Sequence, residues 1–443
     1  MIDAIRNAII LPDLRRKIVF TLMILIVYRA AAHIPVPGVN ADALRQFLET
    51  GQTGGQVIVQ FLNLLSGGAL VNFSIMAMGV YPYITASIIM QLLNPLVPQL
   101  RELAKEGEQG RNKLTLYTYL MTVPLAILQA YGQAIFMQNT VPGMMPDFGF
   151  SVNFLTTLAI LSTLTGGTMI AVWMGELITE QGIGNGLSII IFGGIVAEMP
   201  AQIGGFVSRQ EWGNLVLFTF ITVFTITVIA VVQEGQRRIP VQYGKRVRGT
   251  KVYGGQSTHI PLRVNSAGMI PLIFAQSIMI FPSAVASYFV AANPEGFAHN
   301  VALGVVQWFS PDPSAFPYWI MYFIMVVGFT YFYTDVIFKQ QHLADNLQRQ
   351  GGFIPGLRPG KRTEAYLNSV VQRITFAGAL MLGFVAVLPW LVNIIPGVSQ
   401  SATQTQTLLI TSTGLLIVVG VVLDTVRQLE AQLLMRHYEG FIT

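Results

Sequence analysis

The sequence has no cysteine and few charged residues. Without cysteine, the 443-residue chain has no disulfide bond, no thiolate nucleophile and no cysteine-held metal. Asp, Glu, Lys and Arg make up only 11% of the chain, whereas a soluble globular protein contains about 25%. Because 53% of the residues are apolar, these figures argue against a water-soluble domain and favour a membrane protein with several spans.

The apolar residues fall into ten runs, each long enough for a membrane-spanning helix and too long for the strands of a barrel. The runs are 18–34, 74–97, 115–137, 153–175, 186–206, 214–233, 264–291, 317–338, 369–395 and 404–423. An even number of spans predicts both termini on one side. Ala30-Ala31-Ala32 resembles a signal-peptidase site, but Arg29 and the proline-rich residues 33–38 favour an uncleaved first helix.

Basic residues concentrate in alternate segments between the runs. The N-terminal segment, residues 98–114, 234–263 and 339–373, and the C-terminal tail hold every Lys and Arg except Arg29, Arg45 and Arg209. Segments with such an excess of Lys and Arg stay in the cytoplasm. The sequence therefore predicts that both the N-terminus and the C-terminus are cytoplasmic.

Two of the basic segments, 234–263 and 339–368, are longer than a simple turn. The first has short β-branched and aromatic runs separated by glycine, which predicts a protruding hairpin. The second contains Gly351-Gly352, Pro355-Gly356 and Pro359-Gly360, which predicts a loop rich in turns. Long connections in compact proteins are usually functional, so we interpret both as docking surfaces. The alternative, basic loops that only set topology, explains their charge but not their length.

The stretch from Thr50 to Leu100 has no charged residue and is too long for one helix. Residues 61–73 are apolar but interrupted by Ser66, Gly67 and Gly68. Irregular backbone at membrane depth is tolerated only inside the protein or along a cavity. We therefore expect a short helix folded back into the protein on its outer side. An amphipathic helix on the membrane surface is the alternative.

The pattern Gly-x-x-Pro occurs within two of the apolar runs, in Gly79-Val-Tyr-Pro82 and in Gly268-Met-Ile-Pro271. Proline in a helix interior kinks the helix, so we expect kinks in the second and seventh helices. Interrupted helices at matching positions of two five-helix halves are typical of a transport pathway at the repeat interface. Ordinary helix packing also explains glycine and proline in membrane helices.

The predicted spans contain almost none of the groups that catalysis or proton relay requires. The sequence lacks a His-Glu-x-x-His zinc pair, a Gly-x-Ser-x-Gly elbow and a phosphate-binding loop. We therefore expect neither an enzyme nor a bound cofactor or metal. A path lined by the second, fifth, seventh and tenth helices would have β-branched side chains at its middle: Val80, Ile84, Ile191, Ile273 and Ile417. Such a ring excludes ions when narrow, although core packing uses the same residues.

Several stretches resemble the bacterial SecY family, whose members form the central subunit of the protein-conducting channel. They are Ile34-Pro-Val-Pro-Gly38, residues 61–70, Pro82-Tyr-Ile-Thr-Ala-Ser-Ile-Ile, residues 175–188, residues 253–265, Ala344-Asp-Asn-Leu and residues 351–360. The similarity extends from the first helix to the tail and keeps the motif order.

This resemblance implies an all-α polytopic protein in which ten transmembrane helices form two inverted five-helix halves, 1–206 and 207–443. It implies a channel that passes unfolded secretory polypeptides across the cytoplasmic membrane and releases transmembrane segments sideways into lipid. The five β-branched residues become a pore ring. Residues 61–73 become a plug that seals the outer funnel, with Leu62, Leu65, Ser66, Gly67, Gly68 and Leu70. The second and seventh helices become a lateral gate, with Thr85, Gln91, Asn265 and Gln276.

The resemblance also implies partners. The two basic loops look like the docking site shared by the ribosome and the motor ATPase SecA, with Lys245, Arg246, Arg248, Lys251, Arg358 and Lys361. Thr250 departs from the family pattern, because bacterial relatives often have a basic residue there. The small membrane subunits SecE and SecG, signal peptides, nascent chains and membrane lipid complete the expected partners. The alternative function is a ten-helix secondary transporter of a small solute, which would need polar coordination at the midplane.

Overall fold

The computed structural model describes most of the chain from residue 11 to residue 439. The description omits residues 1–10, 41–42, 45, 48–58, 60–62, 64–65, 67, 142, 151, 209, 211, 244–245, 249–250, 254–256, 269, 277, 280–281, 283–285, 287–295, 310–315, 342, 358–359, 394–401 and 440–443.

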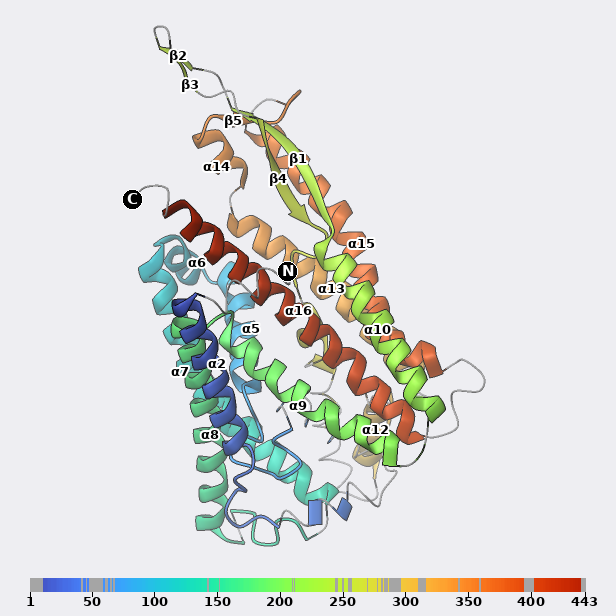
Figure 1. Cartoon of the computed structure of the whole chain (residues 1–443). Coiled ribbons are helices and arrows are strands. Elements are labelled where there is room, and N and C mark those ends of the chain that lie inside the picture. The colour runs from blue at the N-terminus through green and yellow to red at the C-terminus, as the bar shows by residue number, and fades with distance from the viewer. Residues whose placement is uncertain are drawn as a thin grey trace.

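Helices make up most of the described chain and run side by side as a tilted bundle (Figure 1). They are α2 (Pro12–Ala31), α5 (Tyr81–Leu96), α6 (Pro98–Lys105), α7 (Glu108–Thr140), α8 (Phe154–Gln181), α9 (Gly186–Ser208), α10 (Trp212–Glu234), α12 (Phe297–Phe309), α13 (Phe316–Gln341), α14 (Leu343–Arg349), α15 (Lys361–Asn393) and α16 (Ala402–Glu439). Residues 270–276 are also helical. Each predicted run therefore overlaps helical residues.

Four stretches of the described chain are long and apolar enough to cross a membrane: Glu108–Gln138, Phe154–Gln181, Phe316–Arg349 and Lys361–Leu388. Large apolar side chains also point outward from other helices. On α10, Val216 is 70% exposed and Phe220 is 68% exposed. An apolar surface of this extent needs an apolar solvent, so lipid is the medium in which these helices are stable.

The predicted hairpin is confirmed. Strand β1 (Gln236–Tyr243) pairs antiparallel with β4 (Ser257–Arg263), and the register places Ile239 opposite Ile260. The short strands β2 (Arg246–Arg248) and β3 (Lys251–Tyr253) pair near the tip. The hairpin extends beyond the ends of the helices (Figure 1).

The second basic loop joins this hairpin. Strand β5 (Gly352–Phe353) pairs antiparallel with the end of β1, which makes a three-stranded sheet in the order β4-β1-β5. Ile239 and Val241 of β1 are buried in a cluster with Leu347 of α14, Ile354 and Leu367 of α15. The two loops, about 100 residues apart in sequence, are thus one packed unit.

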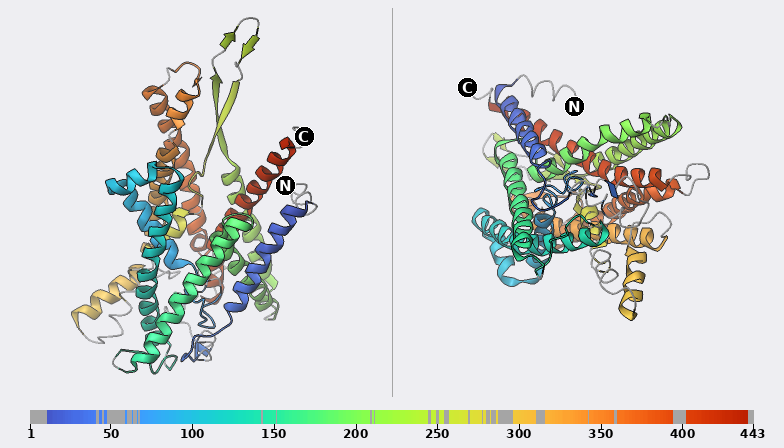
Figure 2. Two further views of the ribbon diagram at one scale, coloured as in Figure 1. Left: turned by 90° about the vertical axis from the view of Figure 1, so that its left-hand side faces the viewer. Right: turned by 90° about the horizontal axis from the view of Figure 1, so that it is seen from below.

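The first and last helices meet at one end of the bundle. Leu14 of α2, Ile183 and Leu429 of α16 form a buried apolar cluster. The start of α2 and the end of α16 lie toward the hairpin end of the bundle (Figure 2). This arrangement agrees with an even number of crossings.

Two expectations about the second and seventh helices are wrong. Ser74 lies in an isolated β-bridge, residues 75–80 form turns, and α5 begins only at Tyr81, so Pro82 lies in its first turn. Pro271 likewise directly follows Ile270, the first residue described as helical in its run. Proline is favourable in the first turn of a helix because the N–H that it lacks would have no partner there. The prolines therefore start these helices and do not kink them.

The turns before α5 pack closely against α8. A Cβ atom added to Gly167 would overlap the carbonyl oxygen of Ile75, whereas one added to Gly166 would meet nothing within 4 Å. We expect Gly167→Ala to displace the Ile75 backbone and to destabilise the fold by about 1–3 kcal/mol. Gly166→Ala, the matched control, should stabilise α8 by up to about 1 kcal/mol. Thermal unfolding midpoints in one detergent measure both; equal midpoints would contradict this packing.

Candidate functional site

The apolar segment predicted to form a plug, residues 61–73 (the plug segment), is buried at most of its described residues, with Val71 and Asn72 partly buried. Ala69, Leu70 and Phe73 have no exposed surface, and Ser66 is 2% exposed. This burial excludes the alternative of a helix on the membrane surface for these residues. Residues 66 and 68–73 form turns and bends, so the expectation of a helix is wrong for that part. Leu62, Leu65 and Gly67 lie outside the described residues.

Hydrogen bonds within the plug segment satisfy its polar groups. The Ser66 hydroxyl donates to the Asn63 carbonyl oxygen (2.9 Å) and accepts from the Leu70 N–H (3.2 Å). The Asn63 side-chain oxygen accepts from the Val71 N–H (3.1 Å). Gly68, with a φ of 82°, allows the turn between them. Irregular backbone can therefore be buried here without a large desolvation cost.

The plug segment is also attached to α2 and to the chain that follows it. The Tyr28 hydroxyl of α2 donates to the Ser66 carbonyl oxygen over 3.1 Å. Beyond α2, the Val36 N–H donates to the Phe73 oxygen and the Ile75 N–H donates to the Ile34 oxygen, both at 3.0 Å. Viewed along the bundle, the blue turns of this part of the chain lie near the middle of the surrounding helices (Figure 2).

The five residues predicted to form a ring gather in one apolar cluster. They come from four separate parts of the chain, and all are buried except Ile84, which is partly buried against the others: Val80, Ile84 (α5), Ile191 (α9), Ile273 and Ile417 (α16). The same cluster contains Tyr28 of α2 and Ala69 of the plug segment. The predicted ring and the predicted seal are thus continuous in space.

The two predicted gate helices meet in a second cluster. Ile88 of α5 packs with Ala267, with Phe274 of the helical residues 270–276, and with Tyr333 of α13. The contact between these two predicted gate helices is therefore apolar.

The polar residues predicted at the gate have separate hydrogen-bond partners. Thr85 accepts a hydrogen bond from Gln129 (3.3 Å), and Gln91 donates to Ser87 of its own helix (3.2 Å). Asn265 donates to the Gly268 carbonyl oxygen (3.0 Å). The side-chain oxygens of Asn265 and Gln276 are buried and have no hydrogen-bond partner among the described residues.

The structure describes the predicted docking residues only in part. Arg246 and Arg248 lie on β2 and Lys251 lies on β3, near the tip of the hairpin. Lys361 is exposed at the first turn of α15. Lys245 and Arg358 lie outside the described residues. The β1–β5 pairing brings the two loops that carry these residues together.

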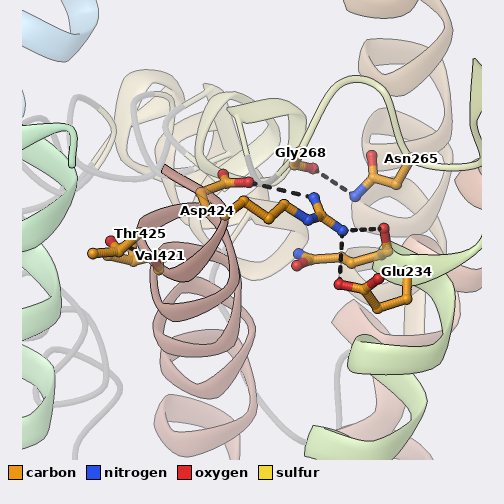
Figure 3. A network of polar contacts seen from close by, with 8 residues as sticks. Glu234, Asn265, Gly268, Val421, Asp424 and Thr425 are labelled. Atoms are coloured by element: carbon orange, nitrogen blue, oxygen red, sulfur yellow. Dashed lines mark hydrogen bonds and ion pairs between the residues drawn. The ribbon is translucent and has the colours of Figure 1, made fainter. Parts of the chain in front are cut away.

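A charged network at the base of the hairpin was not predicted from the sequence. Arg427 of α16 donates to the Gln233 carbonyl oxygen (2.9 Å) and to Glu234 (3.0 Å) at the end of α10, and lies 3.7 Å from Asp424 (Figure 3). A cation beside the last carbonyls of a helix is favourable. The only sequence signal was the i, i+3 pair Asp424 and Arg427 at the end of an apolar run.

The network borders a cavity of about 540 Å³ between α9, α10, α13, α16 and residues 263–270, with both polar and apolar side chains in its lining. Asn185, Gln233, Arg263, Asn265 and Gln428 contribute to its lining. The hairpin ends at Arg263, and Asn265 lies two residues later, so the cavity lies where the hairpin joins the chain that leads to the predicted seventh helix. Within the described part of the chain, no group of three or more His, Asp or Glu could hold a metal ion.

A family model described as SecY matches residues 74–426. The protein translocase subunit SecY of Halalkalibacterium halodurans is 45% identical over all of both chains. That of Thermotoga maritima is 43% identical over all of this chain and 98% of its own. The chain belongs to the SecY family. Membership confirms the predicted class, a subunit of the protein-conducting channel that is not an enzyme.

Solved structures agree with the fold of this SecY-family chain. A structure described as a protein conducting channel has a TM-score of 0.62 at 17% identity and covers 94% of this chain and 92% of its own. Sec61 in the canine ribosome–channel complex from the endoplasmic reticulum has a TM-score of 0.64 at the same identity and coverage. The solved structures therefore agree with a mostly helical membrane fold, whereas the predicted all-α class is too narrow because β1–β5 form strands. The identity to bacterial SecY subunits assigns the chain to the translocase of the bacterial cytoplasmic membrane.

Proposed function

We propose that this chain forms the pore through which unfolded secretory polypeptides cross the cytoplasmic membrane and from which transmembrane segments pass sideways into lipid. The observation that carries this proposal is the 45% identity to a protein translocase subunit over the whole of both chains. The convergence of the five predicted ring residues in one buried cluster supports it.

The proposed topology has ten spans in two inverted halves, 1–206 and 207–443, with both termini in the cytoplasm. The contact between α2 and α16 near the hairpin end supports it. The concentration of Lys and Arg in the hairpin and in the segment around α14 supports a cytoplasmic position for that end.

In the proposed mechanism the ring is a hydrophobic constriction, which excludes ions when closed and binds no translocating sequence tightly. The plug segment closes the outer side of the ring. The apolar contact of Ile88 with Phe274 and Tyr333 closes the gate between α5 and the helix that begins near residue 270. An apolar segment of a translocating chain leaves through this gate because lipid is a better solvent for its side chains than water.

The driving energy comes from partners. We propose that the joined basic loops, with Arg246, Arg248, Lys251, Arg358 and Lys361, bind the motor ATPase SecA or the translating ribosome. A ribosome–channel complex of the structurally similar Sec61 supports the second partner. SecE and SecG would complete the membrane complex, and signal peptides would bind at the gate.

Protease protection tests the proposed function. The purified chain, reconstituted with its small subunits in vesicles, should import an unfolded secretory precursor into a protease-resistant compartment when SecA and ATP are supplied. Saturable uptake of a small solute without precursor import would instead support the secondary transporter.

A further inference from the structure

Arg427 joins α16 to the start of the hairpin. Its guanidinium donates to the Gln233 carbonyl oxygen and to the Glu234 carboxylate, both in the last turn of α10 (Figure 3). Strand β1 begins at Gln236, two residues after Glu234. Hydrogen bonds from a charged donor are roughly twice as strong as neutral ones, and the Arg427 side chain is only 24% exposed. The end of α10 is therefore held to α16 just before the hairpin begins.

The base of the hairpin is paired up to the end of α10. The register of β1 and β4 places Gln236 opposite Arg263, and the Val264 N–H donates to the Gly235 carbonyl oxygen over 2.9 Å. Ile239 of β1 is buried in the cluster beneath the sheet. A displacement of the outer part of the hairpin therefore reaches the last turn of α10 through paired backbone.

Arg427 and Thr425 project from opposite faces of α16. Two residues turn an α-helix by about 200°, and Figure 3 shows Thr425 on the side of α16 away from Glu234. Leu429, four residues after Thr425, shares its face. One short section of α16 therefore has one face toward the base of the hairpin and another face away from it.

The face with Thr425 and Leu429 contacts the first predicted half of the chain, residues 1–206. A Cβ atom added to Gly184 would lie 3.0 Å from the Thr425 hydroxyl oxygen, so the turn before α9 packs closely on α16. Leu429 is buried with Leu14 of α2 and Ile183. This section of α16 thus lies between the hairpin base and the first half and contacts both.

We propose that Arg427 is a positioning residue that couples the hairpin to the ring, because it makes the end of α10 and α16 move together when a partner displaces the hairpin. Ile417 of the ring lies on the same helix, about 15 Å from Arg427 along its axis. The displacement therefore shifts both Ile417 and the contact with the first half. The proposal rests on the proposed function, in which the hairpin binds a partner and the ring opens for a polypeptide.

Arg427→Met tests the coupling, because methionine keeps a long apolar side chain and removes the charge and every donor. Precursor export into vesicles that contain the reconstituted complex is measured at increasing SecA concentration. The maximal rate should fall about tenfold, as expected for the loss of a hydrogen bond to a charged group. The SecA concentration that gives half the maximal rate should stay the same, because the hairpin itself is unaltered. Arg111→Met, the same change at an exposed position of α7, should change neither value.

Two further variants test whether the effect belongs to this network. Arg427→Lys keeps the charge and a donor group, so it should recover most of the maximal rate. Glu234→Gln weakens the same network from the other side. Added to Arg427→Met, it should lower the maximal rate no further, since the effects of residues in one network are not additive. An additive fall, or no recovery with lysine, would contradict coupling through this contact.

Thermal unfolding separates coupling from a general structural role. Glu234 and Asp424 are 58% and 56% exposed, so loss of Arg427 leaves no buried charge and should cost little stability. The Arg427→Met and Arg111→Met proteins should unfold within about 3 °C of each other. An unchanged maximal rate, or a fall accompanied by a larger loss of stability or by a higher half-saturating SecA concentration, would overturn the coupling. If the unaltered chain exported no precursor, the proposed function would fail instead, so the two failures are distinguishable.

Discussion

Deletion of residues 62–72 is expected to make the resting channel leak ions. The described part of this stretch is buried: Ala69 packs in the cluster of the ring residues, and Leu70 packs in the neighbouring cluster. Its removal exposes the apolar ring to water from the outer side, so the ring alone must exclude ions. We expect the resting conductance of the purified complex in planar bilayers to rise at least tenfold, as expected if the packing removed stabilises the closed state by about 1.4 kcal/mol or more.

A replacement of equal length distinguishes two causes of the leak, the loss of apolar packing and the loss of the chain itself. Residues 62–72 exchanged for a Gly/Ser sequence keep the connection but lose the apolar contacts, so this variant should leak as the deletion does. Equal resting conductance for the deletion and the unaltered channel would show that the plug segment is not a seal.

Arg358→Glu is expected to stop motor-driven export while the protein remains folded in the membrane. Ile354, four residues before Arg358 in the sequence, packs with Ile239 and Val241 of β1. A partner that binds a basic surface presents acidic groups to it. A glutamate at position 358 would therefore face like charges of the partner, at a cost of several kcal/mol. Export of a precursor into vesicles should therefore fall more than tenfold.

Arg111→Glu is the matched control, because it makes the same charge change at an exposed basic position of α7 outside the two loops. It should retain export within about twofold, as expected for an exposed charge that contributes less than ~1 kcal/mol. Unchanged export by Arg358→Glu, or equal loss in both variants, would contradict the proposed docking surface.

The sequence predicted the helices well because their signal is local. Runs of about 20 apolar residues have few alternatives to a helix in a membrane, and the glycine-bounded β-branched runs around Ile239 predicted the hairpin. Helix ends were less predictable. Helix α16 extends from Ala402 to Glu439, well beyond the apolar run 404–423. Its C-terminal part is polar, and the hydropathy of the sequence does not mark where a polar helix ends.

The errors arose where distant contacts decide the structure. Residues 74–80 are apolar enough for a helix, but the backbone of Ile75 bonds to Ile34 and packs on Gly167, which holds turns in place. Those turns make Pro82 a starting residue. The pairing of Gly352 and Phe353 with β1 is two residues long and has no periodicity to detect. The Tyr28–Ser66 and Arg427–Gln233 contacts likewise join residues far apart in the sequence.

The central claim is that a polypeptide passes through the ring, and site-specific crosslinking of a stalled secretory chain tests it most directly. Photo-crosslinkers at positions 84, 191 and 273 should each capture the stalled chain. One at Val216, 70% exposed on α10, should capture lipid and no secretory chain. Capture of the stalled chain at Val216, with none at the three ring positions, would show that the polypeptide takes another path and would contradict the account.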